Sequence, residues 1–180
     1  FFAAKGLKTM PIGGGAIATL TDAGTGRGAA WAANGDITFQ ASLYPQTPLT
    51  RFTAAGGKSE PATTLGPDET THRWPTVLPN GKLLYSSNVD VSGWDNGTVR
   101  VETDPGVPGK VVVRGGYHPH YVPTGHLLYV HAGTLYGVRF DLERLEPTSP
   151  PATIVDRILS SAATGGAQYS IGADGTLAYV

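Results

Sequence analysis

The feature that most constrains the fold is a short hairpin signal that occurs four times along the 180 residues. Each copy has apolar runs around a turn that ends in glycine: Asn34-Gly35, Asn80-Gly81, Thr124-Gly125 and Asp174-Gly175. Glycine reaches the positive φ angles of a tight hairpin, so we expect a two-residue turn at each copy. The glycines are 46, 44 and 50 residues apart. A repeat of that length with several short strands predicts the four-stranded antiparallel blades of an all-β propeller.

The residues around each turn repeat as well. Four positions before the glycines stand large apolar or aromatic residues: Trp31, Val77, Tyr121 and Ile171. Four positions after them stand aromatic residues: Phe39, Tyr85, Tyr129 and Tyr179. We expect these side chains to face the neighbouring sheets and to pack between them. An ordinary antiparallel sandwich, with hairpins that match by chance, is the alternative fold.

The repeat also predicts how the chain is divided. We expect one propeller domain over 1–180, in five parts: 1–22 as the end of a blade, 23–65, 66–115 and 116–158 as full blades, and 159–180 as the start of a blade. The expected strands of the full blades lie near 28–32, 36–41, 49–53 and 60–64, near 73–78, 82–87, 97–102 and 109–114, and near 117–122, 126–130, 133–139 and 152–156. The half-blades can close a four-bladed ring, or two chains can form an eight-bladed homodimer. A fragment of a longer propeller is the third possibility.

Several of these segments resemble a known family. The residues that carry the likeness are Arg73-Trp74-Pro75, 78–81, 121–129, 133–135, 138–142 and 174–180. They are similar to the WD40-like repeats of the Tol-type propellers, above all to the propeller regions that follow the kinase domain of some bacterial serine/threonine protein kinases. The resemblance implies a sensory or scaffolding role on the outer side of a bacterial membrane, in a periplasmic or other extracytoplasmic location.

Composition excludes several classes of function. The net charge of −1 argues against a nucleic-acid binder, which needs a basic face for phosphates. No apolar stretch is long enough to span a bilayer. The absence of cysteine removes disulfides and thiolate chemistry, and the glycine-rich stretches at 13–15 and 24–28 lack phosphate-loop spacing. We therefore expect no cofactor, and the compartment stays open.

Candidate site residues gather where the innermost strands begin. On the repeat alignment these entry segments are 25–28, 71–74, 116–120 and 164–168, and propellers present ligands along their central channel. The candidates for ligand binding are Arg27, His72, Arg73, His118 and His120, with Trp94 from the loop at 87–98. The arginines would bind an anion. Alternatively, these side chains cap the ends of the inner strands. No His or carboxylate spacing predicts a metal site.

The first functional prediction is a non-catalytic interaction or sensor module that binds a protein segment or small ligand at the channel face. The alternative is a hydrolase that acts on glycosides or esters, with the channel histidines and acids from the loops. The candidate acids are Asp68, Glu69, Asp90 and Asp95, each of which has an ordinary turn or surface role as its simpler explanation. The sequence has no Gly-x-Ser-x-Gly elbow and none of the kinase motifs.

Overall fold

A computed structural model describes residues 1–3, 6–23, 26–42, 45–90, 93–172 and 174–180. Every regular element among these residues is a β-strand, and all strand pairs within the sheets are antiparallel. None of the described segments forms a helix with the length and hydropathy of a membrane span. The prediction of an all-β fold built from antiparallel sheets is confirmed.

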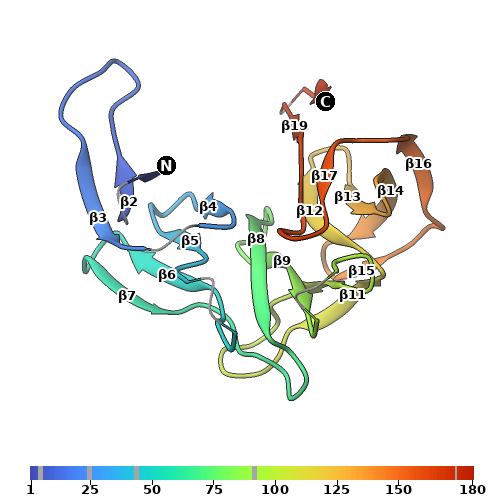
Figure 1. The fold of residues 1–180 in the computed structure, drawn as a ribbon, viewed down its shortest axis with the longest axis horizontal. Coiled ribbons are helices and arrows are strands. Elements are labelled where there is room, and N and C mark those ends of the chain that lie inside the picture. The colour runs from blue at the N-terminus through green and yellow to red at the C-terminus, as the bar shows by residue number, and fades with distance from the viewer. Residues whose placement is uncertain (4–5, 24–25, 43–44, 91–92, 173) are drawn as a thin grey trace.

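The strands form successive sheets along the chain (Figure 1). The first sheet contains β1 (Phe2–Ala3), β2 (Gly6–Thr9) and β3 (Ala18–Asp22). The second contains β4 (Ala29–Trp31), β5 (Ile37–Phe39), β6 (Thr50–Thr53) and β7 (Lys58–Pro61). The third contains β8 (Thr71–Val77), β9 (Leu83–Asn88), β10 (Thr98–Val101) and β11 (Lys110–Arg114).

The fourth sheet contains β12 (Tyr117–Val122), β13 (His126–His131), β14 (Thr134–Asp141), β15 (Glu146–Pro147) and β16 (Ala152–Val155), of which β15 and β16 both pair with β14. Two small ribbons follow: β17 (Ser160–Ser161) with β18 (Gly166–Ala167), and β19 (Tyr169–Ile171) with β20 (Leu177–Tyr179). The strands fall at the predicted positions, with ends that differ by a few residues. The division into blades stays a prediction.

The four repeated turns share one geometry. The φ angles of Gly35, Gly81, Gly125 and Gly175 are 89°, 82°, 82° and 86°. Each glycine N–H donates to the carbonyl three residues earlier, at 2.8–3.0 Å. Asn80 keeps a negative φ, so the expected two-residue turn with two positive φ angles is wrong. The structure has instead a β-turn followed by a glycine bulge, and the Asn80 side chain accepts a hydrogen bond from the Lys82 N–H at 3.2 Å.

The hydrophobic core lies between consecutive sheets. Leu84, Val99 and Val101 of the third sheet pack with Leu127 and Val138 of the fourth. Equivalent clusters join the first sheet to the second, the second to the third, and the fourth to the terminal ribbons. Sheets that pack face to face in chain order are the arrangement of propeller blades.

Most of the predicted packing residues lie in these cores. Phe39, Tyr85 and Tyr129 are buried, and Val77, Tyr121 and Ile171 are partly buried against the same clusters. Trp31 and Tyr179 are the exceptions, with 67% and 56% of their surface exposed. Tyr179 lies on the edge ribbon β19–β20, where no third strand covers it among the described residues.

The two ends of the chain do not complete a shared sheet. Among the described residues, β1–β3 and β19–β20 form separate sheets, and both termini lie at the upper side of Figure 1. The strand exchange expected for a four-bladed ring is therefore not made within this chain. Blade number and ring closure remain predictions.

Candidate functional site

A backbone irregularity recurs where the inner strands begin. Gly28, Trp74 and His118 have φ angles of 89°, 52° and 51° and are 46 and 44 residues apart, the same intervals as the hairpin glycines. The pairing of β8 shifts between Arg73 and Thr76, and that of β12 shifts between Tyr117 and His120. A bulge turns side chains away from the regular alternation. This repeated bulge brings the predicted segments toward one another.

Hydrogen bonds join the entry segments directly. The Trp74 N–H donates to the Arg27 carbonyl at 2.9 Å, and its indole Nε1 donates to the Thr164 carbonyl at 3.0 Å. Arg73 Nη1 donates to the carbonyls of Ala163 and Thr164 at 3.3 and 3.1 Å. Residues 90 and 91 positions apart thus meet at one place. Of the first segment, residue 25 lies outside the described residues.

His118 is held in a defined orientation. Its ring lies 4.6 Å from the Trp74 ring and 5.1 Å from the Tyr169 ring, measured between centroids. Its Nδ1 accepts a hydrogen bond from the Ala167 N–H at 2.7 Å, so the neutral ring carries its proton on Nε2. Burial, and then the neighbouring His120, lower the pKa of His118 to about 4. This imidazole is therefore neutral at pH 7, with a donor at Nε2.

His118 and His120 line one pocket of about 390 Å³ between β4, β8 and β12. We call it the histidine pocket; its other lining residues are Gly28, Ala29, Ala30, Trp31, Trp74, Pro75, Thr76, Val77 and Pro119. Burial also lowers the pKa of His120. Among the described residues, His120 has no hydrogen-bond partner for its ring nitrogens. The pocket therefore holds two neutral imidazoles, and none of its lining residues is an acid.

Arg27 and Arg73 lie close enough for their charges to interact. Burial, and then the charge of Arg27, lower the pKa of Arg73 to about 10. Arg73 is 5% exposed, and neither arginine forms an ion pair with an acid among the described residues. The Nε atoms of both arginines are buried without a hydrogen-bond partner.

Trp94 is buried, whereas the sequence allowed either an exposed position in its loop or packing on its own blade. It is 1% exposed and belongs to the core between the fourth sheet and the terminal ribbons. The Arg73 guanidinium carbon lies 4.8 Å from the centre of the Trp94 ring, within the range of a cation–π contact. The polar neighbours of Trp94 in the sequence suggested a surface loop. Its buried position depends on later parts of the chain, since it packs in the core beside the terminal ribbons and the backbone of residue 165 approaches the indole closely.

The structure places His72 away from the histidine pocket. Its side chain is fully buried and contacts two polar groups: Thr63 Oγ1 lies 2.8 Å from Nδ1, and Glu69 Oε2 lies 3.3 Å from Nε2. Because the ionised Glu69 can only accept, the neutral imidazole donates its Nε2–H to Glu69; the Thr63 hydroxyl, which accepts from the Leu49 N–H, donates to the unprotonated Nδ1. Burial lowers the pKa of His72, which stays neutral.

Glu69 is the centre of this buried network and not a surface acid. It is 3% exposed and accepts hydrogen bonds from the Gly66 N–H at 2.5 Å and from the Ser87 hydroxyl. Arg100 Nε lies 2.5 Å from Glu69 Oε1 at an angle outside hydrogen-bond geometry, so this contact is an ion pair. Burial raises the pKa of Glu69, but its hydrogen bonds outweigh burial and lower it to about 2.

The remaining candidate acids, Asp68, Asp90 and Asp95, lie outside the histidine pocket. Asp68 and Asp90 are exposed, and Asp95 accepts a hydrogen bond from the Ala132 N–H at 2.9 Å. The described residues contain no group of three His, Cys, Asp or Glu side chains able to hold a metal ion.

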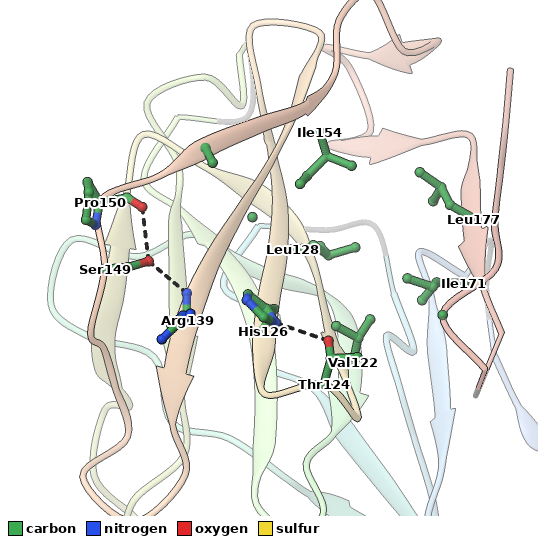
Figure 2. Close-up of a pocket in the computed structure, with 13 residues that line it drawn as sticks. Val122, Thr124, His126, Leu128, Arg139, Ser149, Pro150, Ile154, Ile171 and Leu177 are labelled. Carbon is green, nitrogen blue, oxygen red and sulfur yellow. Dashed lines mark hydrogen bonds between the residues drawn. The ribbon is translucent and has the colours of Figure 1, made fainter.

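A second pocket of about 450 Å³ lies between the fourth sheet and β19–β20 (Figure 2). Its wall is mostly apolar, with Leu128 and Ile154 on one side and Ile171 and Leu177 on the other. Figure 2 also shows the His126 ring, whose Nδ1 lies 3.1 Å from the Thr124 hydroxyl. The sequence prediction missed this pocket, because local hairpin signals do not specify how the fourth sheet and the β19–β20 ribbon pack against each other.

No family model matches the chain, and no curated protein matches it. Among solved structures, the chain is similar to regucalcin, a calcium-binding protein from Agrobacterium tumefaciens, with a TM-score of 0.53 and 14% sequence identity. The likeness covers 89% of this chain and 68% of the regucalcin chain. It supports a regucalcin-like β-propeller fold and not the kinase-linked, WD40-like assignment. This comparison contradicts the prediction of a non-catalytic interaction module.

Proposed function

We propose that the chain is a hydrolase that cleaves an ester in the histidine pocket. The observation that carries the proposal is the pair of neutral imidazoles on one pocket wall, only one of which has its Nδ1 occupied by a backbone N–H. Such a pair offers both a proton acceptor and a hydrogen-bond donor at neutral pH.

The two histidines take different roles. The unengaged His120 accepts a proton from a water molecule, whose oxygen attacks the ester carbonyl carbon. The carbonyl oxygen gains the negative charge, and His118 stabilises it by donating its Nε2–H. When the tetrahedral intermediate collapses, the carbon–oxygen ester bond breaks and the proton on His120 passes to the leaving alkoxide.

The lining residues favour an ester over a glycoside. Glycoside hydrolysis generally uses two carboxyl groups on either side of the bond, and no acid lines this pocket. A calcium ion, which regucalcin binds, does not fit these residues either. Calcium requires oxygen ligands, chiefly carboxylates, whereas the polar side chains at the convergence of the entry segments are mainly histidines and arginines. No step is therefore assigned to a metal.

The test is turnover by the purified chain on chromogenic esters, a lactone and chromogenic glycosides. We expect turnover of at least one ester and a fall in kcat/KM of about 10²–10⁴-fold for His120→Ala, the usual contribution of a general base. His131→Ala is the matched control, because His131 lies outside the pocket, and it should retain full activity. No ester turnover by the parent protein would overturn the proposal, as would full activity of a folded His120→Ala variant.

The pH dependence gives a second test. The base acts only when His120 is unprotonated, so kcat/KM should rise with pH through the pKa of His120 and then level off. Because burial lowers that pKa below the ordinary 6.5, the midpoint should lie below pH 6.5. A midpoint above 6.5 would assign the proton transfer to another group.

A further inference from the structure

Two cations without an acid partner among the described residues lie beside the histidine pocket: Arg73 is buried and Arg27 is partly buried. The other arginines that form ion pairs do so at the surface or, for Arg100, with the buried Glu69. Arg27 and Arg73 have no acid partner among the described residues, and the charge of Arg27 contributes to lowering the pKa of Arg73. An arrangement of this kind costs stability unless something compensates it.

The hydrogen bonds of the two guanidinium groups leave donors unused. Arg73 donates through Nη1 alone, to the carbonyls of Ala163 and Thr164, and Arg27 donates through Nη1 to the Gly26 carbonyl at 3.3 Å. Both Nε atoms are buried and unpaired. Buried donors in native proteins almost always have a partner, and unpaired ones therefore require an explanation.

A purely structural role explains only part of this arrangement. Arg73 holds the loop at 163–164 through two backbone carbonyls and packs over Trp94. That role needs one cation. It does not explain why the charge of a second guanidinium acts on the first, since among the described residues the Arg27 side chain donates only to the carbonyl of its own neighbour, Gly26.

We propose that Arg27 and Arg73 form a binding site for an oxyanion, a carboxylate or a phosphate group, where the entry segments meet. The planar fork of a guanidinium matches the paired oxygens of both groups, and two forks can share one anion. Trp74 connects this site to the histidine pocket, because its backbone N–H binds the Arg27 carbonyl and its ring contacts His118. The extension that the ester substrate carries this anion rests on the proposed function, whereas anion binding itself does not.

The experiment titrates the full chain with inorganic phosphate and, separately, with acetate, at an ionic strength kept constant with sodium chloride. Calorimetry gives the affinity and thermal unfolding gives the change in Tm. We expect at least one of the two anions to bind and to raise the Tm of the parent protein. Arg27→Gln should weaken anion binding by roughly tenfold or more. The affinity of Arg27→Lys should lie between those of the parent protein and of Arg27→Gln. Arg51→Gln is the control, because Arg51 is paired with Glu60 and Glu102 at 3.9 and 4.0 Å and should leave the affinity unchanged.

The sign of the stability change separates this site from a structural role. Without added anion, Arg27→Gln should raise the Tm, because it removes a like charge beside Arg73; with a saturating anion the parent protein should be the more stable of the two. No binding of either anion, or equal binding by Arg27→Gln, would overturn the proposal. Because these readouts need no turnover, an inactive protein that binds phosphate or acetate contradicts the ester hydrolase and leaves the anion site standing.

Discussion

Replacing Glu69 by glutamine should destabilise the protein more than any other single acid substitution among the described residues. Glutamine keeps the size of the side chain and still accepts one hydrogen bond. It cannot balance the charge of Arg100, whose Nε lies 2.5 Å from the carboxylate and whose side chain is 19% exposed. The variant therefore leaves a largely buried cation without its counter-ion.

Two routes give a similar magnitude for this loss. The hydrogen bonds from His72, Ser87 and Gly66 that lower the carboxyl pKa from 4.5 to about 2 on folding correspond to about 3 kcal/mol of stability at neutral pH, and a neutral glutamine accepts such bonds less strongly. Removing one partner of a buried ion pair costs about 3–5 kcal/mol in other proteins. We therefore expect Glu69→Gln to lose about 3 kcal/mol, which lowers the Tm by about 6–12 °C in a chain of this size.

The loss should depend on pH in a defined direction. The pKa of Glu69 is lower in the folded than in the unfolded chain, so its contribution is present above about pH 4.5 and disappears as the pH falls through about 2. At pH 3 the parent protein and the variant should differ by only about 1 kcal/mol.

Denaturant unfolding followed by tryptophan fluorescence, at pH 7 and pH 3, measures both values. Glu60→Gln is the matched control: Glu60 is 53% exposed and lies 3.9 Å from Arg51, so its loss should cost no more than about 0.5 kcal/mol. The reasoning is refuted if Glu69→Gln costs less than about 1 kcal/mol at pH 7, or if its cost is the same at both pH values.

Two further predictions concern glycines. Gly166→Ala should cost about 1–3 kcal/mol in denaturant unfolding, because its Cβ would lie 2.6 Å from the Trp74 ring, while Gly13→Ala, with no atom within 4 Å, should be neutral; equal values would contradict the packing described for Trp74. Gly81→Ala should cost about 1–2 kcal/mol, since φ is 82° there, and Gly81→Asn should cost less, so a neutral Gly81→Ala would show that the turn tolerates another geometry.

The sequence predicted the sheets because their signals are local. Each hairpin needs only a glycine at the bulge and apolar residues on both sides, and all of these lie within about ten positions. The exact turn was not predictable from the Asn-Gly pair. Asn80 favours a positive φ in a two-residue turn, but its side chain also stabilises the longer turn by accepting the Lys82 N–H, and the structure adopts the second.

The roles of individual polar residues were harder to predict, because they depend on distant partners. Glu69 looked like a turn acid until Ser87 and Arg100, 18 and 31 positions later, were placed against it. The histidine pocket was partly predictable, since the repeat aligned His118 with Trp74. The different states of His118 and His120 were not, because the Ala167 N–H that separates them comes from a later segment.

The neighbouring residues His72 and Arg73 show how satisfied and unsatisfied polar groups can be told apart. Both lie on β8 and both are buried, so burial alone assigns them the same role. The ring nitrogens of His72 both have partners, in a network that Glu69 and Arg100 balance in charge. Arg73 keeps an unpaired buried Nε and an uncompensated neighbour in Arg27. A closed network contributes to stability, whereas an open one reduces it until a ligand completes it. A substitution of Glu69, the partner of His72, should therefore lower the stability of the protein. A substitution of Arg27, the like charge near Arg73, should raise it.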